Sequence, residues 1–323
     1  MTIVTALPGA LEARQRGDLC SGSMPAVSAI LPSYNHARYL RRAIESVLAQ
    51  DADLELVLID DASTDESPRI IDEFAGDPRV RITHHERNRG VSPTFNEGLE
   101  LARADVVAYI GSDDYWLPEH LSGGLEDLER SGAAMVYGRA RLVDENDHEV
   151  TDLPLFDSVP NESFFEALLD RPNFVPFISV LMRRDIVQGV GGFDETVVTL
   201  QDYDLWLRLS VGHPVYFRDA ETVAFRWDGG NTSAPTAANK ERYTREFTHI
   251  MEKLMREFAG ELERRDLADG LRRRLARHYV RMARRSSNPA EQAELYRTSL
   301  SLNPKLRVAQ RYLFSRVRAL VTP

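Results

Sequence analysis

The stretch DVVAYIGSDDYWLP, residues 105–118, decides how this chain folds, because it runs from a strand directly into an acidic loop. Val106 to Ile110 is a β-branched and aromatic run typical of a buried parallel strand, and Pro118 suits the first turn of a helix. Asp113 and Asp114 are therefore expected at the carboxyl end of a strand, where open α/β sheets bind ligands. Two carboxylates there could hold a divalent ion and a sugar hydroxyl. Alternatively, they form a solvated turn before a helix whose dipole favours acidic residues.

Three similar units precede this stretch, each with a strand-like run, a polar loop and a helix with apolar residues on one face. We expect strands at 27–31, 54–59 and 80–83, with helices at 39–50, at 67–74 and after Gly90. Four successive units predict an α/β fold with a doubly wound, mainly parallel sheet whose functional loops gather at one edge. The first turn lacks the glycine-rich phosphate loop of Rossmann and P-loop proteins, so a ligand must be bound by other chemistry.

The chain length and the single cysteine limit the organisation further. A chain of 323 residues can form one large α/β domain with an appendage, or two domains. Cys20 excludes an internal disulfide framework and a cysteine-based zinc site, which favours a reducing, cytoplasmic location. We expect a disordered leader over 1–24, a catalytic α/β domain over 25–239 and a helical region over 240–323, and no apolar run reaches the roughly 18 residues of a membrane span.

Charge is distributed unevenly between the two main regions. Residues 1–239 hold 20 basic and 40 acidic side chains, whereas residues 240–323 hold 20 basic and 10 acidic ones. The acidic body argues against nucleic-acid binding. The basic tail, with helices expected at 241–258, 262–285, 289–302 and 306–320, could contact the inner membrane face, pack on the body or form a homodimer. We expect it to lie outside the donor site.

Four motifs in a fixed order resemble the family 2 inverting glycosyltransferases of GT-A fold. They are VSAILPSYN at 27–35, LIDDASTD at 58–65, NRGVS at 88–92 and GSDD at 111–114. The resemblance covers roughly residues 26–233 and implies a nucleotide-diphospho-sugar transferase. It implies that Pro32, Tyr34 and Asp61 line the nucleobase pocket, that Asn88 belongs to the same donor site, that Asp113 contacts the ribose and that Asp114 binds the metal.

The chemistry of such a transfer accounts for the acidic loop. When a nucleotide-sugar donor reacts, the nucleotide diphosphate departs and its developing negative charge must be stabilised. A UDP-sugar is the first candidate for this donor. A protein without a phosphate loop can do this with a hard cation, and oxygen ligands such as Asp114 select Mn²⁺ or Mg²⁺. Ser112 occupies the first position of the family's Asp-x-Asp motif, which leaves one carboxylate fewer.

Two further aspartates are candidates for the reaction itself. Asp202, in QDYDLWLR at 201–208, falls at the start of a helix with an apolar face, so it is either an N-cap or the general base that deprotonates the acceptor hydroxyl. The resemblance favours the base, with Gln201 in place of the first Glu of the family's acidic motif. Asp228 replaces the His of the family's closing Arg-x-His pattern, and it is either a metal ligand or a turn residue.

Two other functions compete with a metal-dependent, inverting glycosyltransferase of polysaccharide or glycoconjugate biosynthesis. A sugar-phosphate nucleotidyltransferase would share the sheet and the ion, but it should show a glycine-rich basic loop where this chain has PSYN at 32–35. A non-catalytic nucleotide-sugar-binding or scaffold protein would retain Asp61 and Asp114 without turnover. Asp202 argues against the scaffold.

Overall fold

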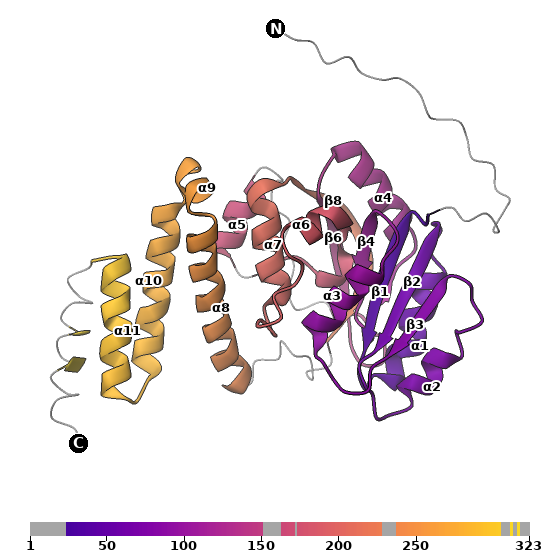
Figure 1. The fold of residues 1–323 in the computed structure, drawn as a ribbon, viewed down its shortest axis with the longest axis horizontal. Coiled ribbons are helices and arrows are strands. Elements are labelled where there is room, and N and C mark those ends of the chain that lie inside the picture. The colour runs from indigo at the N-terminus through magenta and orange to yellow at the C-terminus, as the bar shows by residue number, and fades with distance from the viewer. Residues whose placement is uncertain are drawn as a thin grey trace, which may run out of the picture.

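The computed structural model describes residues 24–150, 163–171, 173–227, 237–304, 311–312 and 315–316 (Figure 1). Residues 1–23 of the expected leader, Asp228 and most of the helix expected at 306–320 lie outside the described residues. No helix within the described ranges is both long enough and apolar enough to cross a membrane.

A single eight-stranded sheet forms the centre, with the strand order β3-β2-β1-β4-β7-β6-β8-β5. The strands are β1 Val27–Ser33, β2 Leu54–Asp60, β3 Val80–His84, β4 Val106–Tyr109, β5 Tyr115–Trp116, β6 Met135–Val143, β7 Leu181–Arg183 and β8 Val215–Arg226. The first four strands are mutually parallel, β6 and β8 run in the same direction, and β7 and β5 are antiparallel to their neighbours. The predicted mainly parallel sheet is confirmed.

Helices cover both faces of this sheet, as a doubly wound fold requires. They are α1 Ala37–Leu48, α2 Ser67–Asp72, α3 Val91–Leu101, α4 His120–Ser131, α5 Phe164–Asp170, α6 Arg184–Gly189 and α7 Gln201–Gly212, with a short 3-10 turn, η2 Phe177–Ser179. Strand β1 shows how the sequence builds the two layers. Ile30 packs into the cluster of α3 and α7, whereas Ala29 and Leu31 pack into the cluster of α1 and α4. This alternation follows the two-residue period of a strand.

The C-terminal region is helical, as predicted. It consists of α8 Ala237–Glu257, α9 Ala259–Arg264, α10 Ala268–Arg285 and α11 Pro289–Leu302. The prediction of one continuous helix over 262–285 is wrong, because Asp266 adopts a left-handed conformation with φ of 55° and ends α9. The N–H of Leu267 then donates to the carbonyl oxygen of Leu262 at 2.8 Å, which closes α9 in a Schellman arrangement.

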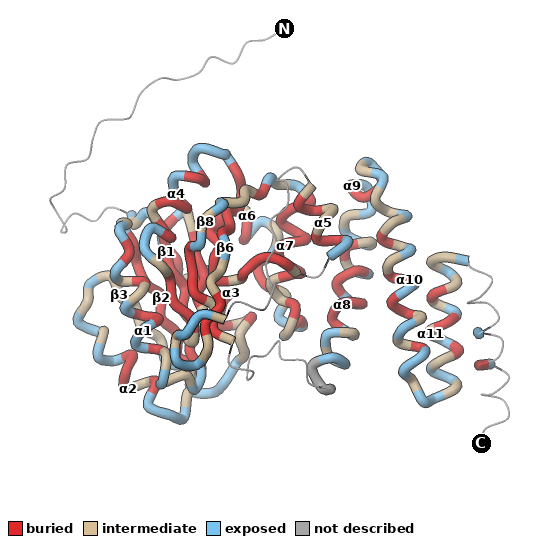
Figure 2. The backbone as a smooth tube through the Cα atoms, turned by 180° about the vertical axis from the view of Figure 1, so that it is seen from behind, coloured by how far each residue is buried: buried red, intermediate tan, exposed pale blue. Residues whose placement is uncertain are grey.

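Helix α8 shares its core with the sheet domain. Its apolar face contributes Phe247, Ile250, Met251 and Leu254 to the same buried cluster as Trp206 of α7. Figure 1 shows α8 beside α5 and α7, with α10 and α11 farther from the sheet, and Figure 2 shows buried residues continuing through α7 into α8. The predicted boundary at residue 239 falls inside α8, so apolar packing crosses it.

Candidate active site

The acidic loop after β4 brings two carboxylates together over Gly111. If residue 111 had a Cβ atom, it would lie 2.7 Å from Oδ2 of Asp114 and 2.9 Å from Oδ1 of Asp113. The two carboxylate oxygens therefore converge on one point, which only glycine leaves unfilled. Asp114 is buried and Asp113 is partly exposed, so the pair has one anchored member and one that solvent reaches.

Arg226, at the end of β8, holds this acidic loop in place. Its backbone N–H donates to Oδ1 of Asp114 and its Nε donates to the carbonyl oxygen of Asp113, both at 2.8 Å. Its two terminal nitrogens donate to the carbonyl oxygen of Asp144 and to Oδ1 of Asp147, at 2.5 and 2.6 Å. The guanidinium also lies 4.2 Å from the ring centroid of Tyr39. Arg226 thus joins β8 to the loop and to the turn after β6.

Asp61 organises the neighbouring loops at the carboxyl ends of β2 and β3. Its N–H donates to the carbonyl oxygen of Ser33 at 2.8 Å. Its Oδ1 bonds Nδ1 of His85 at 2.7 Å and accepts the backbone N–H of Arg89 at 2.8 Å, and its Oδ2 accepts the N–H of Gly90 at 2.9 Å. The carboxylate therefore fixes the loop that leads into α3.

The other residues that the sequence predicts for the donor site lie along the same edge. Pro32 is partly buried in β1, and Tyr34 follows the strand with 46% of its side chain exposed. Asn88 is exposed and donates from Nδ2 to the carbonyl oxygen of Asp61 at 3.3 Å. Ser112 shares a hydrogen bond of 2.7 Å with Nδ1 of His36, which ties the loop after β1 to the acidic loop. The structure thus gathers the predicted donor residues at one sheet edge.

Asp202 lies in the first turn of α7, as predicted, and is mostly buried. Its Oδ2 accepts from Nδ2 of Asn173 and its Oδ1 accepts from the backbone N–H of Tyr203, both at 2.7 Å. Burial raises the pKa of Asp202 to about 6, although these two donors oppose the shift. A carboxyl group with a pKa near neutrality is suited to accept a proton in a reaction.

Stacked aromatic rings connect the helix of Asp202 to the acidic loop. The ring of Tyr109, the last residue of β4, stacks on Phe177 at 5.8 Å, and Phe177 lies 6.2 Å from Trp206, one turn after Asp202. Tyr109 and Trp206 are fully buried and Phe177 is partly buried, so the three rings form a packed connection. Asp202 is therefore held in a fixed relation to the loop of Asp113 and Asp114.

A carboxylate of α8 holds the segment that leads into Asp202. Oε1 of Glu246 accepts the N–H of Val198 at 3.0 Å, and Oε2 accepts those of Thr199 and Leu200 at 2.8 and 3.0 Å. Glu246 is only 7% exposed. Three backbone N–H groups before α7 are thus satisfied by one side chain from the C-terminal region.

Lys253 of α8 reinforces this attachment. Its Nζ lies 2.6 Å from Oδ2 of Asp194 and 3.5 Å from Oδ2 of Asp204. Burial alone would raise the pKa of Asp194, but the Lys253 ammonium and two hydrogen bonds from Thr196 hold it well below its usual range. The loop before α7 is therefore pinned to α8 at both of its ends.

Sequence reasoning did not find Asn173 or Glu246. Glu246 did carry a signal, because it lies on the apolar face of α8 together with Phe247 and Ile250, and an acid on such a face is rarely unpaired. Asn173 carried none, since a single amide between helices has no spacing that marks it. Arg226 is the arginine of the family's closing Arg-x-His pattern, but its role as the anchor of the acidic loop was not predicted.

The acidic loop offers oxygen atoms, which are the ligands that a hard cation prefers. Its convergent oxygens come from carboxylates only, which suits Mn²⁺ or Mg²⁺. Within the described ranges, no group of three or more His, Cys, Asp or Glu side chains could hold a metal ion. A cation at this loop would therefore draw only part of its ligands from the carboxylates of the described residues.

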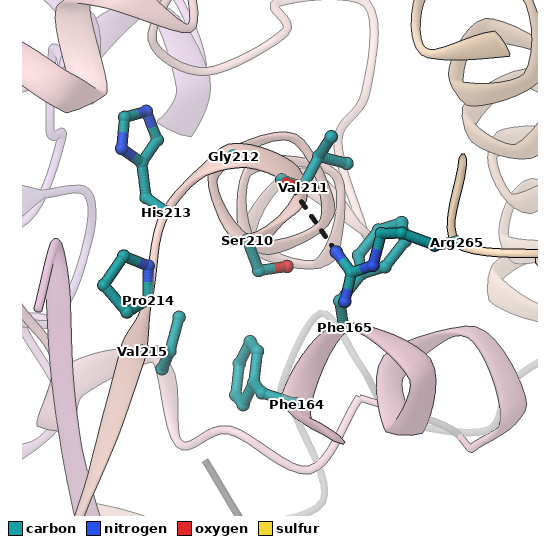
Figure 3. Close-up of a pocket in the computed structure, with 9 residues that line it drawn as sticks. All are labelled: Phe164, Phe165, Ser210, Val211, Gly212, His213, Pro214, Val215 and Arg265. Carbon is teal, nitrogen blue, oxygen red and sulfur yellow. Dashed lines mark hydrogen bonds between the residues drawn. The ribbon is translucent and has the colours of Figure 1, made fainter. Parts of the chain in front are cut away.

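A cavity of about 250 Å³ lies at the other end of α7 (Figure 3). Its lining includes Phe164 and Phe165 of α5, the segment 210–215 and Arg265, whose Nη1 donates to the carbonyl oxygen of Val211 at 3.4 Å. This segment ends α7 and begins β8, roughly 15 Å along the helix from Asp202 and at the amino edge of the sheet. The cavity is therefore separate from the candidate active site.

The mainly parallel sheet with helices on both faces has the GT-A fold of nucleotide-diphospho-sugar transferases. The chain belongs to glycosyl transferase family 2, whose profile matches residues 28–190, half of its length.

Individual relatives are consistent with this assignment. The chain is 32% identical over 173 residues to an uncharacterized glycosyltransferase of Nostoc sp., covering 52% of this chain and 54% of that protein. It is 29% identical over 215 residues to chondroitin synthase of Escherichia coli, covering 65% of this chain and 30% of that protein. The chain therefore spans about half of the first relative and less than a third of the second.

Solved structures support the fold independently. The structure of S. aureus TarS 1–349 in complex with UDP matches with a TM-score of 0.64 and 17% identity, covering 91% of this chain and 88% of that one. The complex of the same protein with UDP-GlcNAc matches with a TM-score of 0.57 over 90% of this chain and 79% of that one. At this identity the likeness concerns the fold.

Proposed function

We propose that this protein is an inverting glycosyltransferase that moves a sugar from a nucleotide-diphosphate sugar, with UDP as the first candidate, to an acceptor hydroxyl. The observation that carries the proposal is that one domain holds both a convergent carboxylate loop and Asp202, a largely buried carboxyl group whose pKa burial raises to about 6. Donor binding by relatives supports it, since TarS is named in complexes with UDP and UDP-GlcNAc.

The residues would divide the work between donor and acceptor. Tyr34 offers an exposed ring on which the nucleobase stacks beside Pro32, and Asp61 shapes that pocket by fixing the loop of Asn88. Asp113 receives ribose hydroxyls. Asp114 would hold Mn²⁺ or Mg²⁺, which when bound neutralises charge on the diphosphate. Asp228 would be an additional oxygen ligand.

Asp202 would act on the acceptor. Its carboxylate takes the proton of the acceptor hydroxyl while the oxygen forms a bond to the anomeric carbon, and the bond to the diphosphate breaks with its electron pair on the departing oxygen. Attack from the side opposite the diphosphate inverts the configuration. Asn173 holds the base in orientation through its amide.

The location of the reaction follows from the same proposal. A UDP-sugar donor and the single cysteine Cys20 favour the cytoplasm. The basic C-terminal region would allow peripheral contact with the inner membrane face or pairing with a second copy.

A donor panel tests the proposal. UDP-, GDP- and TDP-sugars are incubated with the full chain and Mn²⁺, and the release of nucleotide diphosphate is measured with and without candidate acceptors, with the anomeric configuration of the product read by NMR. Turnover with inversion supports the proposal. Retention of configuration would overturn it, and donor binding without any hydrolysis or transfer would favour the non-catalytic binding protein. Release of pyrophosphate from a sugar phosphate and a nucleoside triphosphate would instead favour a nucleotidyltransferase.

A further inference from the structure

Two exposed apolar side chains lie close to the segment that leads into Asp202 and to the part of α8 that holds it. Among the described residues, the large hydrophobic side chains that are exposed are Met24, Tyr34, Val198 and Tyr243. Tyr34 belongs to the donor edge. Val198, 43% exposed, donates its N–H to Glu246, and Tyr243, 39% exposed, lies about one turn before Glu246 on α8. An exposed tyrosine next to a catalytic carboxylate is the kind of apolar surface that marks a binding site.

Ring stacking fixes Tyr243 relative to Asp202. The ring of Tyr243 stacks on Phe247 at 6.3 Å with an interplanar angle of 10°, and Phe247 stacks on Tyr203 at 6.4 Å and 16°. Tyr203 in turn donates its N–H to Oδ1 of Asp202. Burial raises the pKa of Tyr243, Arg274 and Arg281 oppose the shift and Asp202 adds to it, which agrees with this proximity.

Two arginines of α10, Arg274 and Arg281, lie near the same aromatic rings. Arg274 lies 5.0 Å from the ring centroid of Phe247. His278 packs on Phe247 at 4.8 Å and must donate from Nε2 to the carbonyl oxygen of Thr244, at 2.9 Å, so its Nδ1 accepts from Arg281 at 3.2 Å. Burial lowers the pKa of His278, with a further contribution from the nearby arginines, so it stays neutral.

The positive charges of Arg274 and Arg281 are not neutralised within the described part of the chain. Arg281 is exposed, and no carboxylate of the described residues forms an ion pair with Arg274 or Arg281. Arg274 uses its guanidinium on the carbonyl oxygens of Leu168 and Arg171. Arg281 therefore presents a cationic group near Tyr243, without a carboxylate partner among the described residues.

We propose that Tyr243 and Arg281 form an acceptor subsite, and that the acceptor is a sugar or polyol that carries an anionic group, phosphate or carboxylate, near its reactive hydroxyl. This inference rests on the proposed transfer reaction and specifies its acceptor. The apolar C–H face of the ring packs on Tyr243, the anion pairs with Arg281, and the hydroxyl reaches Asp202. Anionic lipid headgroups would also pair with Arg281, but they would not contact an aromatic ring that is stacked toward Asp202. A discrete acceptor therefore accounts better for the two side chains together.

Four small probes test the subsite in the full chain saturated with UDP and Mn²⁺. Binding of glycerol 3-phosphate, glucuronate, glycerol and glucose is measured by saturation-transfer NMR. We expect both anionic probes to bind more tightly than their neutral counterparts, and the stronger of the two identifies phosphate or carboxylate. Arg281→Gln should weaken the anionic probes about tenfold and leave the neutral ones unchanged. Tyr243→Ala should weaken glucose and glucuronate, and Tyr243→Phe should retain both.

Arg273→Gln is the matched control, because Arg273 is exposed on the same helix and lacks a carboxylate partner in the described part of the chain. Equal losses in Arg273→Gln and Arg281→Gln, or no preference for anionic probes, would overturn the proposal. So would a loss of binding to phosphatidylglycerol vesicles in Arg281→Gln with unchanged probe binding, since that result assigns the surface to a membrane. UDP affinity, measured separately by thermal shift, shows whether a failure concerns the subsite or the proposed function itself.

Discussion

The backbone N–H of Arg226 donates to Oδ1 of Asp114, across 112 positions of sequence, while its side chain reaches the carbonyl oxygen of Asp113. The end of β8 thus fixes the orientation of both carboxylates in the acidic loop. Because the guanidinium is buried and fully engaged, the loop does not depend on a bound ligand for its shape.

Replacing this arginine should damage both stability and donor binding. Arg226→Gln retains the backbone bond to Asp114 but removes the guanidinium contacts, so the free energy of unfolding should fall by about 2–4 kcal/mol. UDP affinity in Mn²⁺ should fall at least tenfold. Urea denaturation and thermal shift measure the two effects. Arg139→Gln is the control, because its pair with Asp219 is exposed and worth at most about 1 kcal/mol. Unchanged UDP affinity in Arg226→Gln would contradict this role.

Metal dependence should reside in the acidic loop. Chelation should abolish transfer, and Mn²⁺ or Mg²⁺ should restore it. Asp114→Asn should lower turnover about 10²–10³-fold, the usual cost of losing one stabiliser of developing charge. It should also remove the Mn²⁺-dependent part of UDP binding. Asp105→Asn, an exposed carboxylate at the opposite end of β4, should change neither. Full activity of Asp114→Ala in chelator would remove the metal from the reaction.

Asp202→Asn should separate catalysis from folding. The amide still accepts from the Tyr203 N–H, so fold and UDP affinity should be retained, while turnover falls by about 10²–10⁴. If Asp202 were only a cap, the variant would lose at most about 1 kcal/mol of stability and keep its rate. Single-turnover transfer and urea denaturation of the same preparation distinguish these outcomes.

The raised pKa of Asp202 also predicts two opposite dependences on pH. Its folded pKa of about 6 lies above the ordinary value of 3.8, so folded protein binds more protons in this window and stability falls as pH rises from about 4 to about 6. Turnover should rise over the upper part of the same range, because the base must be ionised. The free energy of unfolding of Asp202→Asn, taken relative to that of the wild type, should therefore be on the order of 2 kcal/mol higher at pH 8 than at pH 4. A pH-independent stability difference would disprove the shift.

Glu246 should act as a positioning residue. Glu246→Gln can bond fewer of the three N–H groups before α7, so we expect a loss of about 1–3 kcal/mol in the free energy of unfolding. Turnover should fall while UDP affinity stays unchanged, and the acid limb of the pH–rate profile should shift because Asp202 moves. Glu252→Gln, also on α8, is a control for the helix itself. If Glu246→Gln lost stability but kept its turnover and the acid limb of its pH–rate profile, Glu246 would only support folding.

The sequence was informative wherever local pattern determines structure. The strand runs ending at Ser33, Asp60 and Tyr109 are apolar and bounded by polar loops, so the sheet and its carboxyl edge followed from them. The donor roles of the residues at that edge came from the resemblance to family 2 and stay predictions. Asp202 could be placed at a helix start by its apolar neighbours Leu205 and Leu209. The contacts of Arg226 and Glu246 could not be predicted, because each joins segments far apart in the chain and depends on how helices pack.

The break at Asp266 shows a second limit of sequence patterns. The stretch 262–285 is rich in good helix formers, and no glycine or proline marks the end of α9. Aspartate adopts the left-handed conformation at a modest cost in free energy, and the packing of Leu262 and Leu271 into one core stabilises the turn between them. Tertiary contacts therefore override the local preference there.

Under the proposed reaction, the buried cluster that continues from the sheet through α7 into α8 makes the helical region part of acceptor selection rather than an optional extension. A substitution that shifts α8 by even a small distance would move both Glu246 and Tyr243, and with them the proposed base and the proposed acceptor subsite. We therefore expect α7 and α8 to change together among relatives that differ in acceptor, while the strand ends that carry Tyr34 and Asp61 drift independently. Acceptor preference would then be inherited with the helices, and donor preference with the sheet.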